Sequence, residues 1–459
     1  MFGAGPFAGS YAVPPYPFGV RRHFCFARFA DRLSKKTCAP RSGKGRGALP
    51  KTDMENNAMS MNSTPSGERA HIGFFGCRNA GKSSLVNAVT GQALAIVSNV
   101  RGTTTDPVYK AMELLPLGAV VIIDTPGYDD DGDLGRLRVA RTTDALNRCD
   151  AAVLVVDGEI GFQPSDVKLV EWMKARGLPF LIAWNKADSP SALPAARDTM
   201  SVSALTGAGI QAFKEALARI IPSHAEKKLL SDLVKPGETA ILVCPIDESA
   251  PKGRLILPQQ QAVRDLLDSG SQAVVCRETE LRRTLDSLKA NPALVVTDSQ
   301  AFRAVNEIVP DDIPLTSFSI LMARYKGFLE AAVAGVAAMD SLKSGDHVLM
   351  AEGCTHHRQC NDIGTVKIPR WLCRHVGADL NIETCSGREF PEDLSPYRLV
   401  IHCGGCMLTE TVVQYRMNQA LSQGVPFTNY GTAIARMTGA LERSLRPFPA
   451  VHALLGGEA

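Results

Sequence analysis

The residues of this 459-residue chain that are best placed for chemistry stand in a short glycine-containing run. Residues 76–83 read G-C-R-N-A-G-K-S, which fits the pattern G-x-x-x-x-G-K-S/T between a strand-like and a helix-like segment. Gly76 and Gly81 would let the backbone curl so that its N–H groups face phosphates. Lys82 would add a positive charge, and Ser83 could bind Mg²⁺. The run therefore predicts a phosphate-binding loop.

Further motifs follow this loop in the order typical of GTP-binding domains. Thr104, in G-T-T-T-D, could reach Mg²⁺ and the γ-phosphate. Asp124 and Gly127, in D-T-P-G, could hold the metal through water and sense the γ-phosphate. Asp188, in N-K-A-D, could accept both N–H donors of a guanine edge, which adenine does not offer. The predicted catalytic residues are Lys82, Thr104, Asp124 and Gly127, and the other predicted contacts of GTP are Asn79, Ala80, Ser84, Asn185, Lys186, Ser203 and Ala204.

A second group of reactive side chains comes late in the sequence, where six of the 12 cysteines follow residue 350. Cys354 and His356 come after one apolar, strand-like segment, and His402, Cys403 and Cys406 come after another. Open α/β sheets place ligand sites in such loops beyond strand ends. C-x-H with C-x-x-C suits a tetrahedral Zn²⁺ and an iron–sulfur cluster equally well. Buried thiols without a ligand are the remaining alternative.

The other late cysteines, Cys360, Cys373 and Cys385, have no partner at ligand spacing and are interpreted as core or spare. A GTP-binding protein works in a reducing compartment, where disulfides are rare. We therefore expect no disulfide framework.

Strands and helices alternate along the chain, which predicts an α/β protein of several domains. In the middle segment, strands are predicted at 239–245, 272–276 and 293–297, and helices at 259–267 and 281–289. This segment shows no catalytic constellation, so scaffolding or dimerisation is its expected role. The expected parts are an extension at 1–60, a P-loop GTPase domain at 61–228, a small α/β dimerisation domain at 229–312 and an α/β domain carrying the cysteines at 313–459.

The formal charge of +3 is unevenly distributed. Residues 1–60 hold ten Lys or Arg against three Asp or Glu, which leaves 40 basic and 44 acidic residues in the remainder. With slightly more acidic than basic residues, the chain after residue 60 has no overall electrostatic attraction to nucleic acid, so no nucleic-acid partner is expected. Apolar stretches such as 331–339 are too short to cross a bilayer, so we expect no membrane partner.

Residues 1–60 are rich in Gly, Pro, Phe and Arg and lack the apolar core of a secretory signal. They could be an organellar transit peptide, or the result of a start assigned too far upstream of Met61. We favour the second interpretation. The expected location is cytoplasmic, or organellar if the transit peptide is real.

The nucleotide motifs resemble those of the translation-factor-related GTPases that include tRNA-modification and ribosome-assembly enzymes. Asn79 and Thr104 match that family's G-x-x-N-x-G-K-S loop and G-T-T-x-D switch. The resemblance implies that Asn79 helps to bind a K⁺ ion that stimulates hydrolysis. Tyr128 follows D-T-P-G where Ras-like enzymes carry a water-orienting Gln, so we expect the slow turnover of a switch.

Taken together, the motifs over most of the chain resemble the [FeFe]-hydrogenase maturation GTPases: a P-loop GTPase, a middle domain, C-x-H, 45 residues and H-C-x-x-C. The resemblance implies that Cys354, Cys403 and Cys406 ligate a [4Fe-4S] cluster. His356 and His402 are the candidate fourth ligands. It also implies a homodimer that accepts a transient diiron subcluster from radical-enzyme maturases and delivers it to apo-[FeFe]-hydrogenase.

Two other functions remain open at this point. An RNA-modification or ribosome-assembly GTPase with a structural zinc site would be colourless and would need a basic RNA-facing surface, which the charge balance opposes. A redox or iron sensor whose cluster gates GTP hydrolysis would change its turnover with oxidation state and would transfer no diiron unit.

Overall fold

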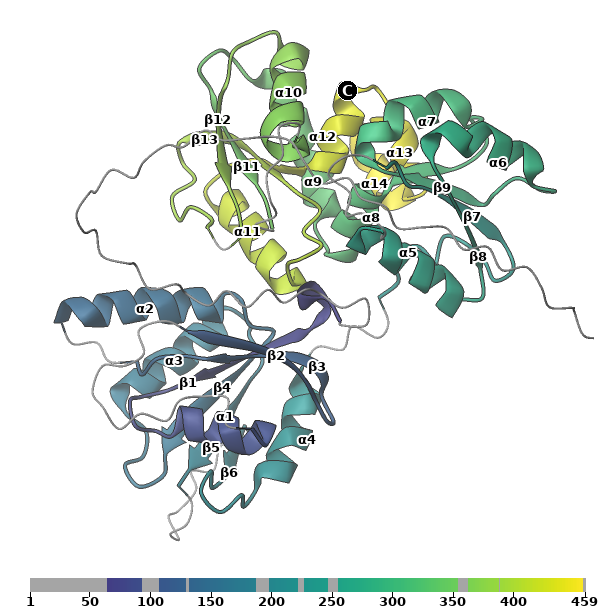
Figure 1. Ribbon diagram of the computed structural model, residues 1–459. Coiled ribbons are helices and arrows are strands. Elements are labelled where there is room, and N and C mark those ends of the chain that lie inside the picture. Colours follow the sequence, from purple (N-terminus) through teal and green to yellow (C-terminus); the bar gives the residue numbers. More distant parts are fainter. Residues whose placement is uncertain are drawn as a thin grey trace, which may run out of the picture. The chain divides into compact units, whose positions relative to one another are not determined.

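The computed structural model describes residues 64–92, 107–128, 132–186, 198–221, 227–246, 255–353, 362–387 and 389–456, with the backbone alone at 132–137. Within these residues the strands form three sheets that are accompanied by helices (Figure 1). The predicted α/β fold class is confirmed. None of the helices in the described part of the chain has the length and apolarity that a membrane span requires.

The first sheet has the strand order β2-β3-β1-β4-β5-β6, and only β2 runs antiparallel to its neighbour. The strands are β1 (Ala70–Phe75), β2 (Val108–Leu114), β3 (Gly118–Asp124), β4 (Ala151–Asp157), β5 (Phe180–Asn185) and β6 (Thr199–Ser201). The helices are α1 (Lys82–Thr90), α2 (Gly132–Leu146), α3 (Pro164–Ala175) and α4 (Ile210–Ile220). Because side chains alternate along a strand, Phe74 and Phe75 enter two different buried clusters. Phe213 of α4 belongs to the first cluster and Leu169 of α3 to the second.

The second sheet has four parallel strands in the order β10-β9-β7-β8. They are β7 (Thr239–Val243), β8 (Gln272–Cys276), β9 (Leu294–Thr297) and β10 (Leu315–Ser317). The helices are α5 (Leu257–Asp268), α6 (Leu281–Ser287), α7 (Phe302–Ile308) and α8 (Phe318–Tyr325). Every residue of β9 is buried, as expected for a parallel strand covered on both faces. The predicted strands and helices of the middle segment are confirmed.

The third sheet is also parallel, in the order β12-β11-β13-β14. Its strands are β11 (His347–Ala351), β12 (Asn381–Cys385), β13 (Tyr397–His402) and β14 (Phe427–Asn429). Its helices are α9 (Leu329–Val336), α10 (Ile368–Val376), α11 (Glu410–Ser422), α12 (Tyr430–Met437), α13 (Leu441–Leu445) and α14 (Pro449–His452). The chain leaves β11 toward β12 on one side and leaves β13 toward β14 on the other. The loops after β11 and β13 therefore border a topological switch point, where open α/β sheets bind ligands.

The second and third sheets repeat one topology and part of one sequence. The segment P-L-T-S-F-S-I-L-M-A-R ends at Arg324, and P-F-T-N-Y-G-T-A-I-A-R ends at Arg436. Each segment contains the last strand of its sheet and the helix after it. Arg324 pairs with Asp232 and Arg436 with Asp340, and each Asp stands seven residues before the first strand of its sheet. Two copies of one supersecondary unit therefore follow the first sheet.

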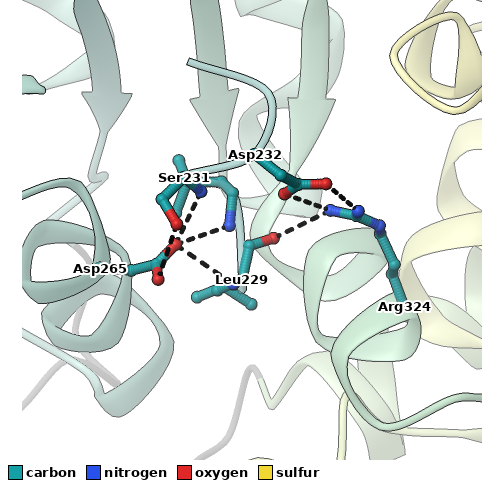
Figure 2. A network of polar contacts seen from close by, with 6 residues as sticks. Leu229, Ser231, Asp232, Asp265 and Arg324 are labelled. Atoms are coloured by element: carbon teal, nitrogen blue, oxygen red, sulfur yellow. Dashed lines mark hydrogen bonds and ion pairs between the residues drawn. The ribbon is translucent and has the colours of Figure 1, made fainter. Parts of the chain in front are cut away.

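Asp265 of α5 fixes the segment that enters the second sheet (Figure 2). Its Oδ2 accepts the backbone N–H groups of Leu229, Leu230 and Ser231 at 3.1, 2.8 and 2.7 Å. Its Oδ1 accepts the Ser231 hydroxyl at 3.1 Å. The segment is thereby held where Leu229 and Leu230 join a buried cluster that contains residues of both parallel sheets.

Candidate nucleotide site and cysteine loops

The phosphate-binding loop lies between β1 and α1, as its sequence predicts. Gly76 and Gly81 have φ values of +142° and +87°, which favour glycine. A Cβ at Gly76 would lie 2.2 Å from the carbonyl oxygen of Val155, so only glycine lets the loop turn this close to β4. Lys82 is buried, and its Nζ donates to the carbonyls of Gly76 and Cys77 at 3.0 and 2.8 Å. The ammonium group is thus held at the loop, where it would meet nucleotide phosphates.

Ser83 and Asp124 come together beside this loop. The Ser83 Oγ donates to Asp124 Oδ2 at 2.7 Å. Asp124 Oδ1 is buried and has no hydrogen-bond partner in the described part of the chain. Burial raises the pKa of Asp124, while the Ser83 hydrogen bond and the Lys82 charge lower it. A buried carboxylate oxygen without a donor, next to a hydroxyl, is a set of hard oxygen ligands that fits Mg²⁺.

Asn185, at the end of β5, joins the phosphate loop to the loop after β6. Its Nδ2 donates to the Ala80 carbonyl at 2.9 Å, and its Oδ1 accepts the Ala204 N–H at 3.1 Å. The Asn185 side chain is buried. The next residue, Lys186, has a φ of +62° and pairs with Asp157. The predicted contacts at positions 80, 185 and 204 are therefore linked by hydrogen bonds.

One residue within the phosphate loop and two beside it complete this region. Asn79 has a φ of +63°, a conformation that Asn adopts more readily than most residues. A Cβ at Gly127 would lie 2.8 Å from the Arg78 Cα, so glycine permits the D-T-P-G segment to approach the loop. Tyr128 is buried, and its ring packs edge-on against Trp172. This packing places the ring in the core. It does not place the ring where the Gln of Ras-like enzymes orients water.

The other predicted contacts of GTP are divided between described and undescribed segments. Ser84 lies in the first turn of α1, and Ser203 is buried and accepts the Thr206 N–H at 3.0 Å through its Oγ. Thr104 and Asp188 lie outside the described residues. Their roles toward Mg²⁺ and guanine stay predictions.

The cysteine loops begin at the carboxyl edge of the third sheet. Ala351 at the end of β11 pairs with Cys385 of β12 on one side and with His402 of β13 on the other. Because the strands are parallel, the segments after them leave from one edge. Cys354 and His356 follow β11 but lie outside the described residues.

Cys403 and Cys406 follow β13 in a short loop. The Cys403 Sγ accepts the N–H groups of Gly353 and Gly405 at 3.1 and 3.4 Å. A Cβ at Gly353 would lie 2.9 Å from Leu408, which shows how closely the two loops approach. Burial raises the pKa of both thiols, that of Cys406 to about 12. Because such thiols ionise when they bind a cation, and because N–H donors to sulfur stabilise cluster thiolates, this loop fits an iron–sulfur group.

A complete metal site would need a ligand from the undescribed part of the chain. No group of three or more His, Cys, Asp or Glu in the described residues could hold a metal ion. The loop that contains Cys354 and His356 begins directly after Gly353, which already contacts Cys403. Cys373 lies on α10, and Cys360 lies outside the described residues.

His402 has hydrogen-bond partners at both ring nitrogens. Its Nδ1 lies 2.7 Å from the Cys403 carbonyl oxygen, and its Nε2 lies 3.1 Å from a guanidinium nitrogen of Arg416. The buried ring stacks on Phe427 and meets Phe328 edge-on. Burial and the Arg416 charge lower the pKa of His402 to about 3. His402 is one of the two predicted candidates for the fourth iron ligand. To bind iron, its ring would have to release one of these hydrogen bonds.

Sequence reasoning missed two side chains beside these loops, Arg416 and Glu352. Arg416 of α11 is buried and contacts His402. Glu352 is buried directly after β11 and accepts the Tyr430 hydroxyl at 3.3 Å. Cys385, interpreted as core or spare, is buried in the core, which raises its pKa to about 11, with Arg416 opposing the rise. Glu352 could have been noticed beside C-x-H, but no spacing marks Arg416.

Family models match three successive parts of the chain. Residues 71–186 match a 50S ribosome-binding GTPase model, 229–327 a hydrogen maturase F dimerization domain, and 330–447 a hydrogen maturase F tetramerization domain. The first match confirms the predicted GTPase domain. The other two support an oligomer, and they assign tetramerization to the region in which the sequence predicts a cluster.

Similar proteins match over shorter stretches. The tRNA modification GTPase MnmE of Acidovorax sp. (strain JS42) is 36% identical over 157 residues, 31% of this chain and 33% of its own length. GTPase Der of Cyanothece sp. (strain PCC 7425) is 35% identical over 121 residues, 26% of either chain. Among solved structures, Era of Aquifex aeolicus is 18% identical, with a TM-score of 0.31, and the match covers 45% of this chain and 91% of Era. The chain spans a third or less of the length of MnmE and Der. Because two models of hydrogen maturase F domains match later parts of the chain, a tRNA-modification function is not favoured.

Proposed function

The chain belongs to the hydrogen maturase F family, and on that basis we propose that it is a GTP-dependent scaffold for the maturation of [FeFe]-hydrogenase. It holds a [4Fe-4S] cluster, accepts a diiron subcluster as cargo and delivers that cargo to the apo-hydrogenase. One observation carries the proposal. The Cys403 sulfur accepts two backbone N–H groups at a switch point of the third sheet, in a chain that also holds a P-loop.

In this proposal Cys354, Cys403 and Cys406 are the cluster ligands. Burial raises the pKa of Cys403 and Cys406, and a cation that binds their sulfur atoms would displace the protons. The N–H groups of Gly353 and Gly405 then donate to an anionic sulfur. His356 and His402 are the candidate fourth ligands. When bound, the cluster supplies an iron whose fourth position can exchange its ligand for cargo.

The nucleotide site performs the second half of the proposed function. Lys82 exchanges its carbonyl partners for phosphate oxygens, and Ser83 and Asp124 hold Mg²⁺. Thr104 completes the metal shell, and Asp188 selects guanine. GTP hydrolysis then governs the exchange of partners rather than the cluster chemistry.

Turnover at this site is slow and K⁺-stimulated. The K⁺ ion is assigned to the amide oxygen of Asn79 by the family resemblance, and Asn79 stands in the phosphate loop with a φ of +63°. Tyr128 packs against Trp172 and orients no water. A slow hydrolysis step keeps the GTP form populated, as a switch requires.

The proposed partners are the radical-enzyme maturases that build the diiron subcluster and the apo-hydrogenase that receives it. The dimerization model covers residues 229–327 and the tetramerization model residues 330–447. Exchange of one oligomeric contact for a partner contact would let a single scaffold serve donors and acceptor in turn.

The test is iron and sulfide analysis with EPR on the full chain, purified without oxygen and reconstituted with iron and sulfide. The same analysis is made on a Cys354→Ser, Cys403→Ser, Cys406→Ser triple variant. About four irons and four sulfides per chain and a reduced [4Fe-4S] signal are expected in the wild type, and both are lost in the variant. Cys244→Ser is the matched control, because Cys244 is a buried thiol that follows β7 of the repeated sheet.

Cluster transfer to apo-hydrogenase is the second step of the test. Chain loaded with a synthetic diiron complex should activate the apo-hydrogenase, and the triple variant should not. Stoichiometric zinc in colourless protein after reconstitution would overturn the cluster assignment. A normal cluster without any transfer would overturn the carrier role.

A further inference from the structure

Arg416 connects three strand ends at the carboxyl edge of the third sheet. Its guanidinium donates to the Glu352 carbonyl after β11 at 3.4 Å and to the Gly387 carbonyl after β12 at 2.6 Å. It also donates to the Nε2 of His402, the last residue of β13, at 3.1 Å. Two of these strand ends lead directly into the cysteine loops. One side chain of α11 therefore fixes their relative position.

Arg416 carries its charge among neutral hydrogen-bond acceptors in the described part of the chain. The side chain is buried, and no ion pair with a carboxylate is among its contacts in the described part of the chain. Its hydrogen bonds all go to neutral acceptors, and its guanidinium lies 5.0 Å from the centre of the Phe390 ring. A buried cation of this kind is costly unless an anion is supplied. Thiolates at the adjacent loop would supply that anion.

The hydrogen bonds determine the tautomer of His402. A guanidinium can only donate, so Nε2 of His402 accepts from Arg416 and carries no proton. The proton of the neutral ring is then on Nδ1, which donates to the Cys403 carbonyl at 2.7 Å. Neither nitrogen is left to bind iron. His402 instead holds the main chain of the residue that supplies a thiolate.

We propose that Arg416 and His402 are positioning residues of the cluster site. Arg416 fixes the His402 tautomer, His402 holds the Cys403 carbonyl, and the Arg416 charge balances the cluster and its thiolates. This inference rests on the proposed function and deepens it. It removes His402 from the candidate fourth ligands and leaves His356.

The tautomer is tested in the metal-free wild-type chain, with ¹⁵N-labelled histidine and long-range ¹H–¹⁵N spectra. The signal that disappears in His402→Gln belongs to His402. A protonated Nδ1 with an unprotonated Nε2 is expected. A protonated Nε2 would overturn the inference, whether or not the chain binds a cluster.

The ligand question is tested on the reconstituted and reduced chain by pulsed EPR with ¹⁵N-histidine. Wild type and His402→Gln should show the same ¹⁵N couplings, because His402 does not touch iron. A strong coupling that is lost in His402→Gln would overturn the inference. If the wild type takes up no cluster, the proposed function fails, and the tautomer measurement still decides the hydrogen-bond assignment.

The charge is tested by the reduction potential of the cluster, followed by EPR. Arg416→Met should shift the potential downward, because a positive charge beside an anionic cluster favours the added electron. Arg416→Lys should restore most of the shift. Arg443→Met is the control, because Arg443 is also buried but donates to the carbonyls of Val309 and Pro310.

An unchanged potential in a folded Arg416→Met variant would overturn the charge role. So would an equal downward shift in Arg443→Met. Loss of iron from Arg416→Met with retained circular dichroism, against normal iron in Arg443→Met, would support the positioning role. If Arg416→Met does not fold, the two nitrogen measurements on wild type and His402→Gln decide the inference.

Discussion

Asn185→Ala should weaken the nucleotide site through two loops that the side chain joins. The amide is buried, donates to the Ala80 carbonyl at 2.9 Å and accepts the Ala204 N–H at 3.1 Å. Removal leaves both main-chain groups without this partner, and each unsatisfied buried group costs about 1 to 2 kcal/mol. The expected total is about 2 to 4 kcal/mol. If the loops separate in the free protein, this cost falls on binding and weakens it by about 30- to 800-fold.

Two assays measure the two places where this free energy can appear. Titration with a fluorescent GDP analogue gives the change in binding, and denaturant unfolding without nucleotide gives the change in stability. Thr206→Ala is the control in the same loop, because Thr206 Oγ1 accepts only the exposed Ala208 N–H at 3.3 Å. The control should change either quantity by less than about 0.5 kcal/mol. The reasoning is refuted if the two changes in Asn185→Ala sum to less than about 1 kcal/mol.

Three other predictions concern separate parts of the molecule. Burial raises the pKa of Cys77 to about 11, so its thiolate fraction is small at pH 8 and rises as the pH approaches 11. Peptide mass spectrometry should therefore find slow alkylation of Cys77 by iodoacetamide, with a rate that still increases at pH 10. An alkylation rate that levels off below pH 9 would contradict this. Asn79→Gly keeps the positive φ without strain. It should remove K⁺ stimulation of GTP hydrolysis and leave the GTP affinity within about three-fold of wild type, a change of less than 1 kcal/mol. If hydrolysis is still faster in K⁺ than in Na⁺, Asn79 is excluded as the K⁺ ligand. Asp265→Ala should lower the free energy of unfolding by about 2 to 4 kcal/mol, because three N–H groups lose a carboxylate acceptor. The control Asp268→Ala removes an exposed ion pair with Arg264 and should change the free energy of unfolding by less than about 1 kcal/mol. Equal effects of the two variants in denaturant unfolding would refute the stabilising role of Asp265.

The nucleotide site shows how far local sequence predicts structure. Gly76, Gly81 and Lys82 take their predicted places because strand, turn and helix are set by a few consecutive residues. The bond between Asn185 and Ala80 spans 105 residues and depends on how β5 and β1 are ordered in the sheet. Strand β4, which separates them and is buried along its whole length, carries no nucleotide motif and was not predicted.

The cysteine loops show the opposite limit. Spacing predicts that Cys403 and His402 stand at a strand end, which the structure confirms. It does not reveal what the two nitrogens of His402 contact, because the partner at Nε2 comes from the second turn of a helix with no recognisable motif. The role of a histidine beside C-x-x-C depends on packing, so sequence alone left it open as a ligand.

The repeated unit separates the scaffold from its chemistry. Thr297 and Asp298 of the second sheet stand where His402 and Cys403 stand in the third, at the end of the third strand of each unit. Asp298 there accepts Gln259 Nε2 of α5 at 2.8 Å, so the equivalent edge is occupied by a structural hydrogen bond. Both copies have the same topology and the same Asp–Arg ion pair. The C-x-H and C-x-x-C motifs, in contrast, follow strands of the third sheet and have no counterpart in the sequence of the second. The proposed cluster function therefore depends on the loops and on Arg416 rather than on the fold that carries them, and substitutions at those positions are its decisive tests.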